Sequence, residues 1–194
     1  MIRHKRQQIV ISGVGGQGVI FLTRLLAEAA ISKGLPVFTS ETHGMAQRGG
    51  TVISHLKVGD FSSPLIRPFK ADGLLALKME GLDLHGVYLK PGSWAIVNHP
   101  GYRAEKLDGP VFSVDADRIA QNISNPRSVN LIVLGFAMAV IAKNIDSKFF
   151  CSIEDIKTVL KNRVGDKHKM LNASLKAIET GYDVGLRKIP NNKS

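Results

Sequence analysis

The sequence contains one cysteine, Cys151, among 194 residues, so no disulfide can form within the chain. The same scarcity excludes a four-cysteine zinc site and an iron–sulfur cluster held by cysteines of this chain alone. Any redox chemistry in which the protein takes part must therefore use a cofactor that is held elsewhere.

Long hydrophobic runs are absent too. The most apolar stretch, Val129 to Ala142, is shorter than the roughly 20 residues that a membrane-spanning helix needs. The basic N-terminus, Met1 to Arg6, is followed by only a short apolar run, whereas a signal peptide has a longer apolar core. We therefore expect a cytoplasmic protein that has no membrane segment.

Acidic residues are outnumbered, since 26 Lys and Arg residues face 16 Asp and Glu residues and the formal net charge is +10. Such a charge suits nucleic acid, a phosphorylated small molecule or an acidic protein surface. Part of it belongs to the chain ends, at residues 3–6 and 187–193. The sequence has no basic stretch interleaved with aromatic residues and no zinc-finger or RNA-binding signature, so we expect no nucleic-acid partner.

The spacing of apolar residues predicts one α/β domain that spans residues 1–194. The chain begins with a predicted strand over 8–12, a glycine-rich turn over 13–18, a helix over 19–30 and a strand over 37–40. Further strands are predicted over 51–58, 71–77, 94–98 and 111–114, with a hairpin turn at Gly59-Asp60. Helices are predicted over 80–85, 130–143, 152–161 and 168–186, and a short one after Asp115, which is its expected cap. Gly34 is expected to end the first helix, and Ser152 to Asp155 to form a capping box at the start of the helix over 152–161. We expect a single Rossmann-like domain over about 8–185, with a mostly parallel, twisted sheet, C-terminal helices and basic tails.

The first glycine motif, Gly13-Val14-Gly15-Gly16-Gln17-Gly18, fits the pattern G-x-G-x-x-G. It leaves a predicted strand and opens a predicted helix, which is the context in which such a loop binds phosphate. Glycines let the backbone approach a ligand, and the helix N-terminus favours an anion. The alternative is a tight turn whose glycines only allow the helix and the strand to pack. No Walker-type lysine follows, so we expect no nucleotide hydrolysis.

A second polar segment, residues 39–50, follows the second predicted strand and holds three glycines, one arginine and one histidine. Arg48 can bind a phosphate or a carboxylate with its planar guanidinium, and the glycines beside it let the backbone approach a ligand or a partner chain. The alternatives are a structural hydrogen bond for His43 and an ion pair with Glu41 for Arg48. Glu41 also lies about where a dinucleotide-binding fold has its ribose-binding acid.

Together the two glycine motifs resemble the gamma subunit, or gamma domain, of the 2-oxoacid:ferredoxin oxidoreductases, which act on pyruvate, ketoisovalerate and related oxoacids. The resemblance is greatest to the small subunit of indolepyruvate oxidoreductase. Further agreement comes from Ser63-Pro64-Leu65-Ile66, from Lys90-Pro91-Gly92-Ser93 before a predicted strand, and from residues 130–135. The resemblance covers about residues 8–185.

This resemblance implies a subunit of a multi-part enzyme that oxidatively decarboxylates a 2-oxoacid to an acyl-coenzyme A. It implies that the chain contributes coenzyme A binding and subunit contacts and is inactive alone. Thiamine diphosphate, magnesium and iron–sulfur clusters are expected on partner subunits, from which ferredoxin receives the electrons. The sequence agrees, because Gly59-Asp60 and Gly165-Asp166 lack the remainder of the motif that binds thiamine diphosphate.

Carried onto this sequence, the resemblance implies cofactor-binding residues in three places. The first loop supplies Gly13, Gly15, Gly16, Gln17 and Gly18. The second loop supplies His43, Gly44, Arg48, Gly49 and Gly50. Asn130, at the start of an apolar helix, either orients a loop or caps the helix. We expect no catalytic residue and no metal ligand on this chain.

Two other functions stay open on the sequence alone. The first is a stand-alone dinucleotide-binding module or dehydrogenase, which the glycine motif and Glu41 favour. The chain has little room for a separate substrate domain, however, and shows no hydride-transfer residues. The second is a structural protein in which both glycine motifs serve subunit packing.

Overall fold

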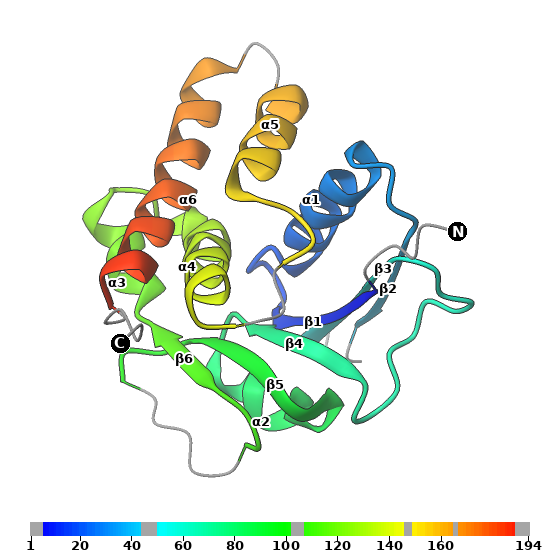
Figure 1. Ribbon diagram of the computed structural model, residues 1–194. Helices are drawn as coiled ribbons and strands as arrows, with labels where there is room; N and C mark the ends of the chain where they lie inside the picture. The colour runs from blue at the N-terminus through cyan, green and yellow to red at the C-terminus, as the bar shows by residue number, and fades with distance from the viewer. Residues whose placement is uncertain (1–5, 44–49, 102–106, 146–148, 165–166, 189–194) are drawn as a thin grey trace.

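Six strands form one sheet in the order β2-β3-β1-β4-β5-β6 (Figure 1). The computed structural model describes residues 6–43, 50–101, 107–145, 149–164 and 167–188, without the side chains of His43 and Val164. The strands are β1 (Gln7–Val14), β2 (Val37–His43), β3 (Thr51–Val58), β4 (Ala71–Ala76), β5 (Leu89–Asn98) and β6 (Val111–Val114). The helices are α1 (Val19–Ser32), α2 (Met79–His85), α3 (Ala116–Asn122), α4 (Val129–Asn144), α5 (Ile153–Val164) and α6 (His168–Lys188). Two short 3-10 helices are η1 (Gly86–Tyr88) and η2 (Pro126–Ser128).

The predicted, mostly parallel sheet is confirmed. The strand β1 runs parallel to β4, β4 to β5, and β5 to β6. Among these six strands, β3 has the opposite direction to the others, because it pairs antiparallel with both β1 and β2. All the predicted elements occur. At most of their ends, the observed boundary lies a few residues from the predicted one.

The predicted hairpin turn at Gly59-Asp60 is wrong. Because β3 pairs with β2 on one side and with β1 on the other, it has no free edge for β4. The next strand, β4, instead pairs with the far side of β1. The hairpin therefore joins β2 to β3, and β3 is inserted between the two strands that α1 connects.

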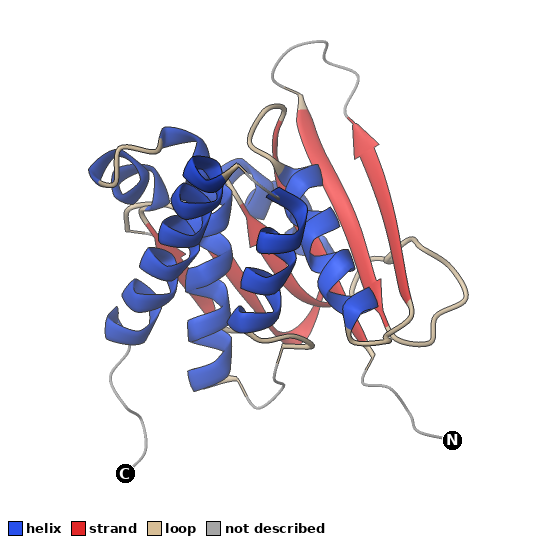
Figure 2. Cartoon of the chain, turned by 90° about the horizontal axis from the view of Figure 1, so that it is seen from above, coloured by secondary structure: helices blue, strands red, loops and turns tan. Residues whose placement is uncertain are grey.

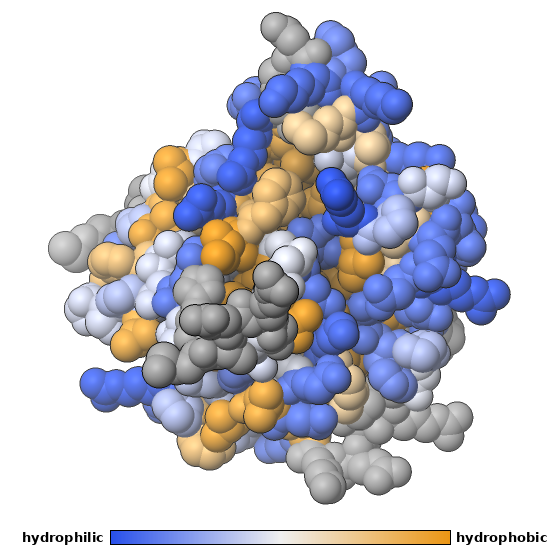
Figure 3. All heavy atoms as spheres, turned by 180° about the vertical axis from the view of Figure 1, so that it is seen from behind, coloured by the Kyte–Doolittle hydropathy of each residue, from blue (hydrophilic) through white to orange (hydrophobic). Residues whose placement is uncertain are grey.

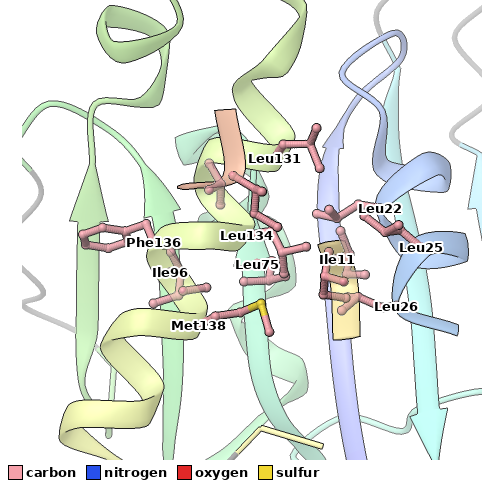
Figure 4. Packing of buried hydrophobic residues seen from close by; sticks show 14 of the residues in the cluster. Ile11, Leu22, Leu25, Leu26, Leu75, Ile96, Leu131, Leu134, Phe136 and Met138 are labelled. Atoms are coloured by element: carbon pink, nitrogen blue, oxygen red, sulfur yellow. The ribbon is translucent and has the colours of Figure 1, made fainter. Parts of the chain in front are cut away.

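The helices cover the two faces of the sheet unequally. In the view of Figure 1, α1, α4, α5 and α6 lie above the sheet and α2 lies below it; Figure 2 shows the former group side by side over the strands. The larger hydrophobic core lies between that group and the sheet. Figure 4 shows Ile11, Leu75 and Ile96 of the sheet beneath side chains of α1 and α4. A smaller core joins the other face to Leu82 of α2.

The helix α4 is apolar enough over residues 126–144 to cross a membrane by length and composition, yet 72% of that window is buried in the fold. It packs closely on α6, where a Cβ on Gly135 would lie 2.0 Å from the carbonyl oxygen of Ile178. A Cβ on Gly181 would likewise lie 2.1 Å from the carbonyl oxygen of Ile132. Its burial is that of a core helix in a soluble protein.

The predicted helix ends are confirmed by their capping contacts. Ser152 and Asp155 form a reciprocal capping box before α5: the Asp155 amide donates to Ser152 Oγ at 3.2 Å, and the Ser152 amide donates to Asp155 Oδ2 at 2.8 Å. Asp115 accepts from the Arg118 amide at 3.0 Å at the start of α3. Gly34, with a φ of 69°, ends α1 in the left-handed conformation.

Candidate functional site

The first glycine loop lies at the carboxyl edge of the parallel strands, between the end of β1 and the start of α1. The neighbouring strand β4 leads into α2, which lies on the opposite face of the sheet from α1. The connections after β1 and β4 thus diverge to different faces. Ligands of open α/β sheets bind at such a point.

The loop is held in a closed turn by its own residues. The Gln17 amide donates to the Val14 carbonyl at 3.1 Å, and the Val14 amide donates to Gln17 Oε1 at 2.9 Å. Gln17 Nε2 also donates to the carbonyl of Leu77, at the end of β4, at 3.5 Å. The Gln17 side chain therefore fixes the loop to the sheet, so its polar atoms serve the protein's own backbone.

The four glycines of the loop meet different surroundings. A Cβ on Gly13 would lie 2.9 Å from both Gln17 Oε1 and Val19 Cγ2, and one on Gly18 would lie 2.2 Å from Asn130 Nδ2. At Gly15 and Gly16, in contrast, a Cβ would meet nothing within 4 Å among the residues that the structure describes. Gly13 and Gly18 thus permit close packing, whereas the backbone at Gly15 and Gly16 faces open space.

Asn130 positions the start of α1, as one of its two predicted roles requires. Its Nδ2 donates to the Gly18 carbonyl at 3.4 Å, and its Oδ1 accepts from the Leu131 amide at 2.8 Å. The side chain is buried. Gly18 has a φ of 80°, and no side chain caps α1 at this residue, so Asn130 supports the loop from beneath.

Several backbone amides at the start of α1 are unpaired hydrogen-bond donors among the described residues. In the described part of the chain, the backbone amides of Gly16, Gly18, Val19 and Ile20 donate to no protein acceptor. They lie at the N-terminal end of a 14-residue helix, where the aligned peptide dipoles produce a partial positive charge. Such an end attracts phosphate and other anions.

The second polar segment reaches the first loop at its C-terminal end. The Gly15 amide donates to the carbonyl of Gly50 at 3.2 Å, and the following residue, Thr51, pairs with Val14 in the sheet. The predicted site residues Gly44, Arg48 and Gly49 lie outside the described residues, as does the side chain of His43. The structure therefore brings Gly50 to the glycine loop and leaves the others as sequence-based predictions.

A hollow of about 300 Å3 opens beside the loop. Its floor is formed by Gly15, Gly16 and Gly18, and its walls by aliphatic side chains of Val14, Val19, Ile20 and Val52. A larger hollow, of about 500 Å3, lies near the far end of α1 and includes Phe149 and Tyr182. The smaller hollow is the candidate site, because both the predicted glycine loop and the unpaired amides at the start of α1 border it.

A buried residue that the sequence analysis missed, Asn98, extends the bracing along the sheet edge. Asn98, at the end of β5, donates through Nδ2 to the same Leu77 carbonyl at 3.2 Å and to Asp117 Oδ2 at 2.7 Å. Its Oδ1 accepts from the Ala116 amide at 2.9 Å. Its signal in the sequence is a polar residue at the end of an apolar strand, and this signal by itself does not identify the partner.

A histidine cluster lies behind the loop, on the face of α2. Ser12, the residue before Gly13, has its Oγ 2.7 Å from Nδ1 of His85. Burial lowers the pKa of His85, and burial followed by the charges of His85 and Lys57 lowers the pKa of His55. Both rings are therefore neutral at neutral pH. Ser12 is fully buried, so this pair braces β1 and does not reach a substrate.

Glu41 does not occupy the position of a ribose-binding acid. It pairs with Ser54 of β3, which in turn pairs with Ile11 of β1. Two strand spacings, about 10 Å, therefore separate Glu41 from the strand that carries the glycine loop. In a dinucleotide-binding unit this acid follows the strand next to the loop, so the insertion of β3 counts against that alternative.

Comparison with known proteins gives a family and a fold. The family of pyruvate ferredoxin/flavodoxin oxidoreductases matches residues 8–184. Indolepyruvate oxidoreductase subunit IorB of Archaeoglobus fulgidus is 30% identical, over 96% of this chain and 98% of the relative. Ketoisovalerate oxidoreductase subunit VorA of Methanothermobacter thermautotrophicus is 30% identical over 91% of this chain, which corresponds to 36% of the longer relative.

Two solved structures share the fold. The gamma subunit of a keto/oxoacid ferredoxin oxidoreductase from Geobacter sulfurreducens has a TM-score of 0.74 and 24% identity, and the match covers 93% of this chain and 98% of that one. The 2-oxoglutarate:ferredoxin oxidoreductase of Magnetococcus marinus has a TM-score of 0.72 and 23% identity over 97% of this chain and 32% of that chain. The latter was solved with 2-oxoglutarate, coenzyme A and succinyl-CoA bound.

Proposed function

The chain belongs to the pyruvate ferredoxin/flavodoxin oxidoreductase family, and on this basis we propose that it supplies coenzyme A binding and subunit contacts to a 2-oxoacid:ferredoxin oxidoreductase. The chain is an oxidoreductase subunit of a complex, as its relatives are. The proposed reaction of the whole complex is the oxidative decarboxylation of a 2-oxoacid to an acyl-coenzyme A. The chain alone is expected to be inactive.

The observation that carries the assignment of coenzyme A is the group of unpaired amides at the start of α1. The backbone N–H groups of Gly16, Gly18 and Val19 donate to no acceptor in the described part of the chain, Gly16 faces open space there, and coenzyme A carries a diphosphate and a further phosphate. Backbone amides at a helix N-terminus bind such groups without a charged side chain. The net charge of +10 adds a long-range attraction for this ligand.

The residues present fit the rest of the ligand as well. The aliphatic walls of Val19, Ile20 and Val52 suit the uncharged parts of coenzyme A, such as the pantetheine arm or the adenine ring. Gly15 and Gly16 leave room for the backbone to approach it. When bound, coenzyme A supplies the thiol that accepts the acyl group. Gln17 and Asn130 keep the amides in place through their contacts with the backbone.

The second loop belongs to the same proposal on the strength of the sequence. His43, Gly44, Arg48 and Gly49 are assigned to coenzyme A or to a partner subunit, and the contact of Gly50 with Gly15 supports a location beside the glycine loop. We assign residues 8–185 to one oxidoreductase domain and the complex to the cytoplasm. Thiamine diphosphate, magnesium and the iron–sulfur clusters are assigned to partner subunits, with ferredoxin as the electron acceptor.

Calorimetric titration of the assembled complex with coenzyme A and with NAD tests this assignment. We expect binding of coenzyme A and none of NAD. Replacement of Arg48 by alanine is expected to raise the KM for coenzyme A in acyl-coenzyme A formation by about tenfold, the effect of one lost charge-assisted contact of about 1.4 kcal/mol. Unchanged kinetics at every coenzyme A concentration would remove Arg48 from the site, and loss of assembly would assign it to the subunit interface.

A further inference from the structure

One face of the sheet is only thinly covered by the protein's own chain. The helices α1, α4, α5 and α6 cover one face, whereas the other has the seven-residue α2, the short η1 and the segment between β3 and β4 (Figure 1). The hydrophobic core on this second face is correspondingly small. A sheet with one weakly covered face commonly completes its core with another element.

Exposed hydrophobic side chains gather on this second face. Of the eight large hydrophobic side chains that are exposed in the described part of the chain, four come from residues 65–87: Leu65, Phe69, Leu84 and Val87. The other four are divided among α1, β2 and α6. Figure 3 shows one side of the molecule, on which groups of hydrophobic residues interrupt a mainly hydrophilic surface. A cluster of exposed apolar side chains marks an interaction site more often than a single one does.

Phe69 and Val87 border a hollow of about 290 Å3. Its other apolar walls include Leu89, Leu107 and Val111. The Phe69 amide donates to the Val87 carbonyl at 3.0 Å, so the segment that carries Phe69 is fixed to η1 at the rim. The hollow is large enough to receive one or two apolar side chains from another protein.

The backbone of Phe69 is strained. Its φ is 60°, in the left-handed region that bulky residues rarely occupy. The ring is nevertheless 60% exposed, so it receives little packing energy from its own chain in return. Glycine or asparagine would fit this backbone with less strain. Strain that the surrounding contacts maintain is typical of functional positions, and an exposed ring at the rim of an apolar hollow suits a binding surface.

Cations without carboxylate partners lie on the same face. The guanidinium of Arg6 lies 4.3 Å, and the ammonium of Lys57 5.1 Å, from the centre of the Phe61 ring. Neither forms an ion pair with a carboxylate in the part of the chain that the structure describes, and the same holds for Arg67. The side chain of Lys57 is only 6% exposed. Lys57 is too buried for a direct contact, but its charge adds to those of the exposed Arg6 and Arg67, so a complementary surface should carry carboxylates.

We propose that this surface, which we call the docking face (Leu65, Phe69, Leu84, Val87, Arg6, Lys57 and Arg67), binds the larger catalytic subunit of the complex. An apolar side chain of that subunit enters the hollow beside Phe69, and its carboxylates meet the exposed Arg6 and Arg67, while the buried Lys57 adds its charge. The inference rests on the proposed function. It is consistent with the ketoisovalerate relative, in which the matching domain is part of one long polypeptide and the remainder of that chain is permanently attached to it.

A second copy of this chain is a poorer occupant than the catalytic subunit. Two chains with a net charge of +10 each repel one another. The three cations of the docking face would also meet apolar or basic groups in a symmetric pair, where the face contacts itself. A partner of different sequence can supply the carboxylates that the docking face lacks.

The test uses the chain co-expressed with the catalytic subunit, and compares wild type with Phe69→Asn. Asparagine tolerates the left-handed backbone better than phenylalanine, so the variant chain alone is expected to melt at the same temperature as wild type or higher. Its affinity for the catalytic subunit is expected to fall by at least about tenfold, the effect of losing an aromatic anchor. If Phe69 serves only the protein's own core, the melting temperature falls and the affinity does not, which would overturn the proposal.

Two further variants complete the test. Ile31→Asp, on the opposite side of the sheet and with 61% exposure, is the matched control and should change the affinity less than twofold. Arg67→Glu should weaken the complex, most strongly at low ionic strength. If the wild-type complex forms and all three variants bind equally well, the docking face is wrong and the proposed function stands. If the wild-type chain binds no catalytic subunit at all, the proposed function itself fails.

Discussion

At the scale of single residues, the glycines of the first loop have separate tasks. Gly13 and Gly18 are places where a side chain would collide with Gln17, Val19 or Asn130. A Cβ on Gly15 would meet no neighbour among the described residues. The φ of Gly15 is not positive, so its backbone lies outside the left-handed region. A small side chain at Gly15 would therefore enter the ligand space without straining the fold.

This difference gives a prediction for Gly15→Ala. The melting temperature should stay the same or rise slightly, because alanine restricts the unfolded chain and meets no neighbour in the folded one. Binding of coenzyme A by the complex should weaken by about tenfold or more, since the methyl group occupies the space that the ligand approaches. Thermal unfolding and calorimetric titration measure the two effects.

Gly101→Ala is the matched control, because a Cβ at that position also meets nothing within 4 Å among the described residues and the residue lies outside the loop. It should leave both the melting temperature and the affinity for coenzyme A unchanged. Equal affinities for Gly15→Ala and Gly101→Ala would show that the ligand does not approach the backbone at Gly15.

At the scale of elements, the closest packing in the molecule joins α4 to α6. Gly135 and Gly181 each face a backbone carbonyl of the other helix at a distance that no Cβ could occupy. The contact fixes α4, and the first turn of α4 carries Asn130, which in turn holds the Gly18 carbonyl. The packing of two C-terminal helices thus bears on the geometry of a loop near the N-terminus.

Gly135→Ala should therefore destabilise the protein. The added methyl group would meet the Ile178 carbonyl oxygen, and the helices must separate to admit it, at a cost of about 3 kcal/mol in the free energy of unfolding. Urea denaturation measures this change. The exposed α6 substitution Lys176→Ala should change the same free energy by about 0.5 kcal/mol or less. If Gly135→Ala unfolds at the wild-type urea concentration, the close contact does not exist in solution.

At the scale of the whole molecule, the two layers differ in their response to pH. The face covered by α2 holds the rings of the buried His55 and the half-buried His85, whose pKa values are both lowered, chiefly by desolvation. Protonation of either ring favours the unfolded chain, where the histidine has its ordinary pKa of about 6.5. The contribution to stability is therefore complete above that pH and decreases as the pH falls below it.

We expect the urea midpoint of the wild-type chain to decrease between about pH 7 and pH 5, and to decrease less in His85→Asn. Asparagine can still form a hydrogen bond with Ser12 Oγ, as acceptor through Oδ1 or as donor through Nδ2, but does not titrate. Replacement of the exposed His168 by asparagine is the control and should leave the slope unchanged. Parallel curves for wild type and His85→Asn would show that His85 does not contribute to the acid sensitivity.

Much of the fold could be predicted from the sequence, because local patterns carry it. The apolar spacing after Val19 and the left-handed stop at Gly34 gave α1 to within a few residues. The Ser152 and Asp155 pair gave the start of α5. The order of the strands was harder to predict, because the alternation of apolar and polar residues identifies β3 as a strand but does not identify the strands beside it. The antiparallel place of β3 between β1 and β2 consequently had to come from the pairing itself.

Of the candidate site, likewise, one part could be predicted from the sequence and another part could not. The glycine motif and its place between a strand and a helix follow from residues that are adjacent in the sequence, so the sequence alone determined where an anion could bind. Which glycines border the hollow without close neighbours, and that Gln17, Asn98 and Asn130 brace the loop, depended on contacts between residues far apart in the chain. Only the tertiary structure decided these points, because a local pattern specifies the conformation of a segment and leaves its distant partners open.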